Sequence, residues 1–104
     1  MRVLVTGGTG FLGGRCLQAL ATSGRFDASA TGRRLSSAPA GFDFIAADLS
    51  EPGALARLPA VDAVVHTAAL SSPWGRAQDF DQANVAATRN LLEWAEKAGV
   101  QRLI

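Results

Sequence analysis

The sequence of 104 residues has little of several residue types, and each shortage excludes a class of protein. Cys16 is the only cysteine, so no internal disulfide can form, and we expect the thiol to lie in the core. The net charge of +1 at pH 7 is too balanced to favour nucleic acid or an anionic membrane surface as a partner. No apolar run approaches the length of a membrane span, and the first residues lack the regions of a signal peptide, so we expect a cytoplasmic protein.

The residues that are present favour a small folded domain. Hydrophobic residues make up 48% of the sequence and charged residues 18%, a balance that supports a buried core and argues against disorder. The length predicts a single domain, which we place over residues 1–104.

The most informative stretch is the first one. An apolar run at residues 2–5 predicts a strand, residues 6–13 (TGGTGFLG) are rich in glycine, and residues 11–20 have the pattern of a helix. The glycine spacing fits both G-x-G-x-x-G and T-G-x-x-G-x-x-G, and a strand, a glycine turn and a helix in this order predict dinucleotide binding. The alternative is an ordinary glycine-rich turn.

A helix N-terminus suits a diphosphate because it offers unpaired N–H groups and the positive end of the helix dipole. Cβ atoms would keep the phosphates away, so each glycine has an expected use. Gly7 or Gly8 would allow the tight turn, Gly10 the close approach of the ligand, and Gly13 the packing of the helix on the strand.

Strands and helices are expected to alternate along the rest of the chain. The further strands are predicted at residues 26–31, 42–46, 63–66 and 102–104, and the further helices at residues 51–58 and 79–98. This order predicts an α/β fold, a Rossmann-type doubly wound parallel sheet of strand order 3-2-1-4-5, truncated at the fifth strand. The ligand crevice would then lie at the carboxyl ends of the first and fourth strands.

Helical spacing also predicts which side chains are buried and where helices begin and end. Leu12, Cys16 and Leu20 recur every four residues in the first helix. In the last helix the predicted buried side chains are Phe80, Ala83, Ala87, Leu91, Trp94 and Ala98. Ser50 is the expected N-cap of the short helix, and Gly24 is expected to end the first one.

Four segments together resemble the extended short-chain dehydrogenase/reductase family, that is, NAD(P)-dependent epimerases, dehydratases and 3β-hydroxysteroid-dehydrogenase-like reductases. The segments are residues 6–13, residues 48–49 (DL), residues 66–69 (HTAA) and residues 84–92 (NVAATRNLL), in the family's order. The resemblance covers nearly the whole chain, and it corresponds to the N-terminal, cofactor-binding part of that family.

The resemblance implies roles for individual residues. Asp48 would hydrogen-bond the adenine with Leu49 beside it, Ala68 and Ala69 would line the floor under the ribose and nicotinamide, and Asn84 would brace the neighbouring strand. The predicted cofactor-binding residues are Gly7, Gly8, Thr9, Gly10, Phe11, Leu12, Gly13, Arg33, Arg34, Asp48, Leu49, Ala68 and Ala69. No catalytic or metal-binding residue is predicted.

Several of these positions also have a purely structural interpretation. Asp48 would cap the helix that follows, Ala68 and Ala69 would be small residues at a strand end, and Asn84 would be a solvated helix residue. His66, at the end of a buried strand, is predicted to be a hydrogen-bonded core histidine rather than a catalytic group.

Two arginines indicate which dinucleotide is preferred. An acid about twenty positions after the glycines selects NAD, whereas an arginine there accepts the 2′-phosphate of NADP. Residues 28–42 contain no acid, and Arg33 and Arg34 end the second strand, so we predict a preference for NADP (NADPH), with NAD possible. The alternative is two solvated arginines in a surface loop.

Catalysis in this family requires a Tyr-x-x-x-Lys pair, and the sequence has no tyrosine and only one lysine, Lys97. The resemblance therefore implies the cofactor-binding part of a reductase or an epimerase/dehydratase that is inactive alone. The partners implied are the cofactor and a small-molecule substrate of the full-length parent, with a homo-oligomer possible. The alternatives are a stand-alone dinucleotide sensor and an interaction module that pairs through an exposed strand edge.

Overall fold

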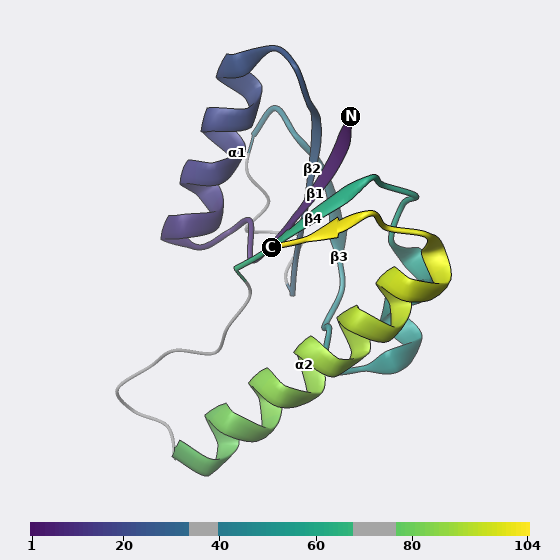
Figure 1. The fold of residues 1–104 in the computed structure, drawn as a ribbon. Helices are drawn as coiled ribbons and strands as arrows, with labels where there is room; N and C mark the ends of the chain where they lie inside the picture. The colour runs from purple at the N-terminus through teal and green to yellow at the C-terminus, as the bar shows by residue number, and fades with distance from the viewer. Residues whose placement is uncertain (34–39, 68–76) are drawn as a thin grey trace.

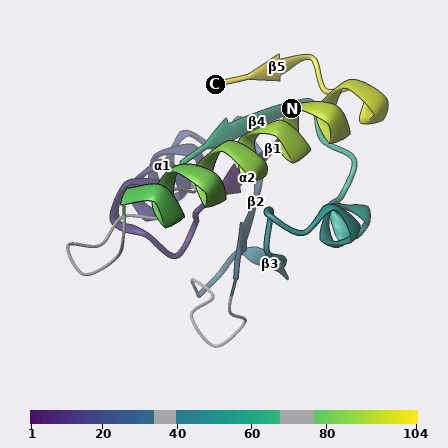
Figure 2. The same cartoon turned by 90° about the horizontal axis from the view of Figure 1, so that it is seen from below.

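The computed structural model describes residues 1–33, 40–67 and 77–104, and within them five parallel strands form one sheet (Figure 1). The strands are β1 (Arg2–Thr6), β2 (Asp27–Gly32), β3 (Asp43–Ala46), β4 (Ala63–His66) and β5 (Arg102–Leu103). The helices are α1 (Phe11–Ser23), the short 3-10 helix η2 (Pro52–Arg57) and α2 (Ala77–Ala98). The strand order is β3-β2-β1-β4-β5, which confirms the prediction, and Figure 2 shows β3 and β5 at opposite edges.

Glycine follows each α-helix at its C-terminal end. α1 continues beyond the predicted Leu20 and is closed by Gly24, whose φ of 68° lies in the left-handed region. Gly99 follows α2 with a φ of 74°. This conformation favours glycine at a helix end, so the predicted end of α1 at Gly24 is confirmed. α2 begins at Ala77, slightly before the expected residue 79.

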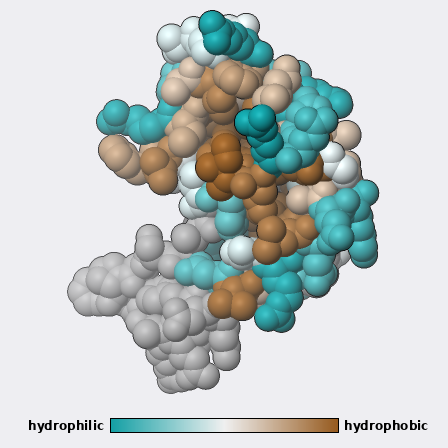
Figure 3. All heavy atoms as spheres, in the orientation of Figure 1, coloured by the Kyte–Doolittle hydropathy of each residue, from teal (hydrophilic) through white to brown (hydrophobic). Residues whose placement is uncertain are grey.

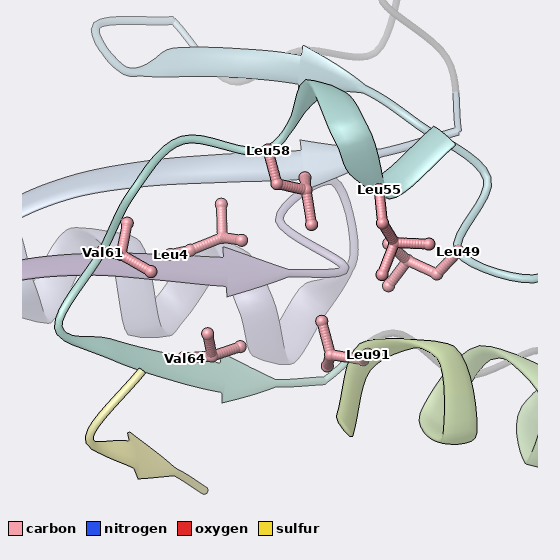
Figure 4. Close-up of a cluster of buried hydrophobic side chains, with 7 residues drawn as sticks. All are labelled: Leu4, Leu49, Leu55, Leu58, Val61, Val64 and Leu91. Atoms are coloured by element: carbon pink, nitrogen blue, oxygen red, sulfur yellow. The ribbon is translucent and has the colours of Figure 1, made fainter. Parts of the chain in front are cut away.

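β1 lies between two hydrophobic clusters because its side chains alternate between the faces of the sheet. The larger cluster consists of Leu4, Leu49, Leu55, Leu58, Val61, Val64 and Leu91, and Figure 4 shows these side chains gathered between β1, β4, η2 and α2. The smaller cluster consists of Val5, Leu17 and Ala30. α1 and α2 therefore cover opposite faces of the sheet (Figure 1).

The prediction of which α1 side chains are buried is wrong for Leu12. Leu12 is 63% exposed, whereas Leu17 is fully buried. Cys16 and Leu20 are partly buried beside the smaller cluster, so the expected burial of the cysteine is only partial. The side of α1 that faces the sheet includes Gly13 and Leu17, and Leu12 is consequently turned outward.

The buried side of α2 agrees with the prediction in its middle but not at its end. Leu91 is fully buried, and Ala87 and Trp94 pack against the larger cluster. Ala95, four residues after Leu91, is buried, whereas Ala98 is exposed. The predicted side chains of Phe80 and Ala83 lie outside the part of the chain whose side chains are described.

The surface is mixed in character. Figure 3 shows hydrophobic residues gathered over the middle of one face, with hydrophilic residues around them. In the part of the chain that the structure describes, no helix is both long enough and apolar enough to span a bilayer.

Candidate functional site

A cleft of about 230 Å³ opens where the parallel strands reach their carboxyl ends. The residues that line it are Gly7, Thr9, Gly10, Thr31, Gly32, Arg33, Ala47, Asp48, Leu49, Ser50, Thr67, Asn84 and Ala87. They come from the ends of β1, β2, β3 and β4, from the segments that follow these strands, and from α2. The cleft therefore lies at the edge of the sheet where the sequence predicts the crevice.

The structure brings about half of the predicted binding residues to this cleft. Those that line it are Gly7, Thr9, Gly10, Arg33, Asp48 and Leu49. Gly8, Phe11, Leu12 and Gly13 belong to the same turn and helix start but are not among its lining residues. Arg34, Ala68 and Ala69 lie outside the described residues.

The glycine turn explains why four glycines stand so close together in the sequence. Gly7 has a φ of 68°, and its carbonyl accepts a hydrogen bond of 2.9 Å from the N–H of Gly10. The N–H of Gly8 donates to the carbonyl of Thr31 at 3.2 Å, which ties the turn to the end of β2. Gly7 is thus the residue that makes the tight turn, because a left-handed φ favours glycine.

Gly8 and Gly13 are needed because protein atoms occupy the space of a Cβ. A Cβ at Gly8 would come within 2.6 Å of the Ala30 Cβ. A Cβ at Gly13 would lie 2.7 Å from the carbonyl carbon of Gly7 and 2.8 Å from the Thr67 Oγ1. Both glycines allow close packing inside the protein, which for Gly13 includes the backbone of the turn itself.

Gly10 differs from Gly8 and Gly13 because few of the described atoms lie beside it. Within the described residues, a Cβ there would approach the Gly7 carbonyl oxygen alone, at 3.3 Å. Gly10 is also the N-cap of α1, has no side-chain capping bond, and is followed by a first turn without acidic residues. The N-terminus of α1, with the positive end of the helix dipole, therefore begins at a residue that lines the cleft.

The end of β2 forms the next part of the cleft. Gly32 lies between two side chains, because a Cβ there would be 3.1 Å from both the Phe44 Cζ and the Thr9 Cγ2. Arg33 follows, is exposed and lines the cleft. The buried Thr31 donates its hydroxyl to the carbonyl of Ile45 at 2.7 Å, which fixes the strand end that carries Arg33.

Asp48 shapes the segment after β3. Its Oδ1 accepts hydrogen bonds from the N–H of Ser50 at 3.0 Å and from the Ser50 hydroxyl at 2.7 Å. The predicted N-cap at Ser50 is wrong: the N-cap of η2 is Glu51, without a side-chain capping bond. Ser50 is instead held by its two hydrogen bonds to Asp48 in a turn that ends one residue before the N-cap.

A polar chain connects the ends of β1 and β4 with α2. The Thr6 Oγ1 lies 2.7 Å from the His66 Nδ1 and accepts a bond of 3.0 Å from the N–H of Thr67. The His66 Nε2 lies 3.2 Å from the Thr88 Oγ1. Burial lowers the pKa of His66, which favours the neutral ring. The prediction of a hydrogen-bonded histidine is confirmed, although its ring is only partly buried.

The predicted set omitted seven of the lining residues. One of them is Asn84, which the sequence singled out only for a structural role. The other six are Thr31, Gly32, Ala47, Ser50, Thr67 and Ala87. Most of them lie within two residues of a strand end, so the signal that identifies them is the predicted carboxyl end of each strand. Among the described residues no group of three or more metal-ligating side chains occurs.

The strand order and the glycine turn define an α/β protein of the Rossmann type. A family model described as the NAD dependent epimerase/dehydratase family matches residues 3–104. The chain belongs to this family, within the extended short-chain dehydrogenases/reductases, as the sequence predicted.

Three known proteins illustrate the relationship. The uncharacterized protein YbjS of Escherichia coli is 40% identical over the whole chain, and the match covers 33% of its own length. The 2-alkyl-3-oxoalkanoate reductase of Stenotrophomonas maltophilia is 34% identical, with 32% of its length matched. A short-chain dehydrogenase/reductase superfamily protein from Agrobacterium tumefaciens, solved with bound NAD, has a TM-score of 0.82 and 34% identity, over 99% of this chain and 31% of that one. The chain thus spans about a third of the length of these relatives.

Proposed function

We propose that the cleft binds a nicotinamide dinucleotide and that it prefers NADP to NAD. The observation that carries the proposal is the uncapped N-terminus of α1, which is open at Gly10 and faces a cleft that also contains Arg33. The diphosphate lies at the first turn of α1, where N–H groups meet its negative charge. Gly7, Thr9 and Gly10 form the backbone of this part of the site.

The adenine half of the dinucleotide is assigned to the side of the cleft formed by β2 and β3. Arg33 grips the 2′-phosphate, since a guanidinium can form two parallel hydrogen bonds to it. Residues 28–42 contain no carboxylate that would repel this phosphate or bind the ribose hydroxyls of NAD. Asp48 and Leu49 flank the adenine, and Asn84 is assigned to the nicotinamide half. Ala68 and Ala69, which lie outside the described residues, are assigned to the same half because the family resemblance implies it.

A titration of NADPH and NADH against the chain tests the preference. Arg33→Ala is expected to weaken NADPH binding by about 1.5–3 kcal/mol, the range for hydrogen bonds to charged groups, and to leave NADH nearly unchanged. Arg34→Ala is expected to have the same effect more weakly. Arg25→Ala is the matched control, because Arg25 is exposed at the opposite end of β2. An equal loss for both cofactors would mean that Arg33 does not read the phosphate, and a wild-type preference for NADH would refute the specificity.

The shared diphosphate site is tested by Gly10→Ala. The added methyl group lies 3.3 Å from the Gly7 carbonyl oxygen and fills the approach of the phosphates, and urea unfolding of the variant separates a loss of affinity from a loss of folded protein. NADPH and NADH binding are expected to weaken alike, by about tenfold or more. Unchanged binding of both cofactors would place the diphosphate elsewhere.

The protein as a whole is proposed to be a reductase or an epimerase/dehydratase that acts on a small molecule in the cytoplasm. Residues 1–104 contribute cofactor binding as one domain, and proton transfer is assigned to residues that this sequence does not contain. The 34% identity to a 2-alkyl-3-oxoalkanoate reductase supports the reductase assignment. The chain alone is expected to show no cofactor-dependent turnover, because positioned acid–base groups typically contribute a rate factor of about 10² to 10⁴.

A further inference from the structure

α2 contributes two residues to the cleft, Asn84 and Ala87, and is joined to the cleft walls by side chains that lie outside it. Thr88 and Asn90 are on the same helix, one and three residues after Ala87. Neither of them lines the cleft, and His66 does not either. These three side chains therefore influence a ligand through the position of α2 rather than by direct contact.

The first connection lies on the β4 side of the cleft. The ring of His66 bridges the hydroxyl of Thr6, at 2.7 Å, and the hydroxyl of Thr88, at 3.2 Å. Thr6 also accepts the N–H of Thr67, and the Thr67 hydroxyl donates to the carbonyl of Thr6 at 2.6 Å. Because Thr67 lines the cleft, the ring links the cleft floor at the ends of β1 and β4 with α2.

The second connection lies on the β3 side. The side-chain amide of Asn90 donates a hydrogen bond of 2.9 Å to the backbone carbonyl of Leu49. Leu49 lies between Asp48 and Ser50, and all three line the cleft. Leu49 is also buried in the larger cluster, so its carbonyl is fixed from two directions. The bond from Asn90 therefore holds α2 against the wall that we assign to adenine.

We propose that the His66–Thr88 bridge and the Asn90–Leu49 bond are two positioning contacts that separately tune the two halves of the dinucleotide site. The proposal rests on the proposed function. The Asn90 contact fixes the segment 48–50, which serves the adenine half. The His66–Thr88 contact fixes Asn84 and Ala87 against the floor at β4, which serves the nicotinamide half. His66, Thr88 and Asn90 are positioning residues and do not touch the ligand.

The experiment compares two probes, NADPH and adenosine 2′,5′-bisphosphate, which occupies only the adenine half. Thr88→Val removes the hydroxyl at nearly constant volume, and Thr88→Ser restores it. Asn90→Leu removes the amide donor at similar size. Thr22→Val is the matched control, because Thr22 is an exposed threonine near the C-terminal end of α1, away from the cleft. Urea unfolding of each variant separates an affinity change from a loss of folded protein.

We expect Thr88→Val to weaken NADPH by about three- to tenfold, the loss of one neutral hydrogen bond, and to leave the bisphosphate within about twofold. Thr88→Ser is expected to restore NADPH binding. Asn90→Leu is expected to weaken both probes, and Thr22→Val neither.

The outcomes distinguish this proposal from the proposed function. If the wild-type chain binds both probes and the two variants bind them equally well, the positioning proposal is overturned and the proposed function stands. If Thr88→Val weakens both probes to the same degree, the separation of the two halves is overturned. A wild-type chain that binds neither probe overturns the proposed function and this proposal with it.

Discussion

The two walls of the cleft are built in different ways. One wall is the glycine turn between β1 and α1, where a single continuous segment supplies Gly7, Thr9 and Gly10. A second wall is assembled from the segment after β3, from Thr67 after β4 and from Asn84 on α2. The first wall is formed mainly by backbone, because glycines leave it with few side chains. The second wall is held together by hydrogen bonds between side chains and backbone groups.

This difference predicts how each wall responds to mutation. At Gly13, which packs against the glycine turn, an added methyl group collides with backbone that cannot move aside, so the smallest substitution has a large effect. In the assembled wall a lost hydrogen bond leaves the fold in place and costs only about 0.5–1.5 kcal/mol. The proposed difference between the two walls would be refuted if substitutions in both lowered the free energy of unfolding by the same amount.

The largest effect is expected for Gly13→Ala. The new Cβ meets the backbone of Gly7 and the hydroxyl of Thr67, so the free energy of unfolding should fall by about 1–3 kcal/mol or more. Gly14→Ala is the matched control, since a Cβ there lies 3.8 Å from the carbonyl oxygen of Gly8. Alanine in the helix should stabilise the control by about 0.5–1 kcal/mol. Urea unfolding of both variants measures the difference, and equal stabilities would show that the turn adapts.

An intermediate effect is expected for Asp48→Ala, in the assembled wall. It removes the acceptor of both Ser50 donors, as the loss of a helix cap does, and should lower the free energy of unfolding by about 0.5–2 kcal/mol. Asp48→Asn keeps the oxygen acceptor and should retain most of the stability. Denaturation at neutral pH distinguishes the two. If asparagine were as harmful as alanine, the charge of Asp48 rather than its turn would be responsible.

The smallest effect concerns the pH dependence of stability that comes from His66. Its pKa in the folded state lies below the ordinary value of 6.5 because burial disfavours the charged ring. The unfolded chain therefore binds the proton more readily. The neutral His66 therefore contributes fully to the free energy of unfolding above pH 6.5. This contribution is lost as the pH falls below 6.5 and through the pKa of His66 in the folded protein. Because the ring is only half-buried, the loss should be modest.

His66→Gln provides the comparison for this pH effect, because glutamine does not titrate. The urea midpoint is measured at pH 7.5 and at pH 5.5. Its decrease between these two pH values should be larger for the wild type than for the variant. A wild-type midpoint that falls no further than that of the variant would show that the ring takes up a proton as easily in the folded protein as in the unfolded chain.

The glycine turn, the strand order and the cleft position could be predicted because each leaves a local pattern. Glycine spacing, a short apolar run and strictly alternating elements are readable without knowing any distant contact. The glycine spacing alone does not show which glycine makes the tight turn and which ones allow close packing. That distinction depends on the atoms that would surround a Cβ at each position. Gly8 is explained by Ala30, which is far away in the sequence, and Gly13 by Gly7 in the same turn together with the distant Thr67.

The assembled wall was predicted less well because its contacts join distant residues. His66 meets Thr88 across 22 positions, and Asn90 meets Leu49 across 41. No periodic pattern in the sequence predicts such pairs. Ser50 has the residue type of an N-cap, but its hydrogen bonds to Asp48 place it in the turn before the helix. Leu12 fits a helical stripe, yet the first turn of α1 faces the sheet with Gly13.

β1 has a position that connects ligand binding with the folding equilibrium. Leu4 and Val5 anchor this strand in both hydrophobic clusters, and the strand runs directly into the turn at Gly7. A ligand held at the turn adds its binding free energy to the whole fold, about 2.7 kcal/mol at a free concentration one hundred times the dissociation constant. Small domains are stable by only about 5–15 kcal/mol, so such a ligand would raise the free energy of unfolding by a large fraction and would lower the unfolded population about a hundredfold.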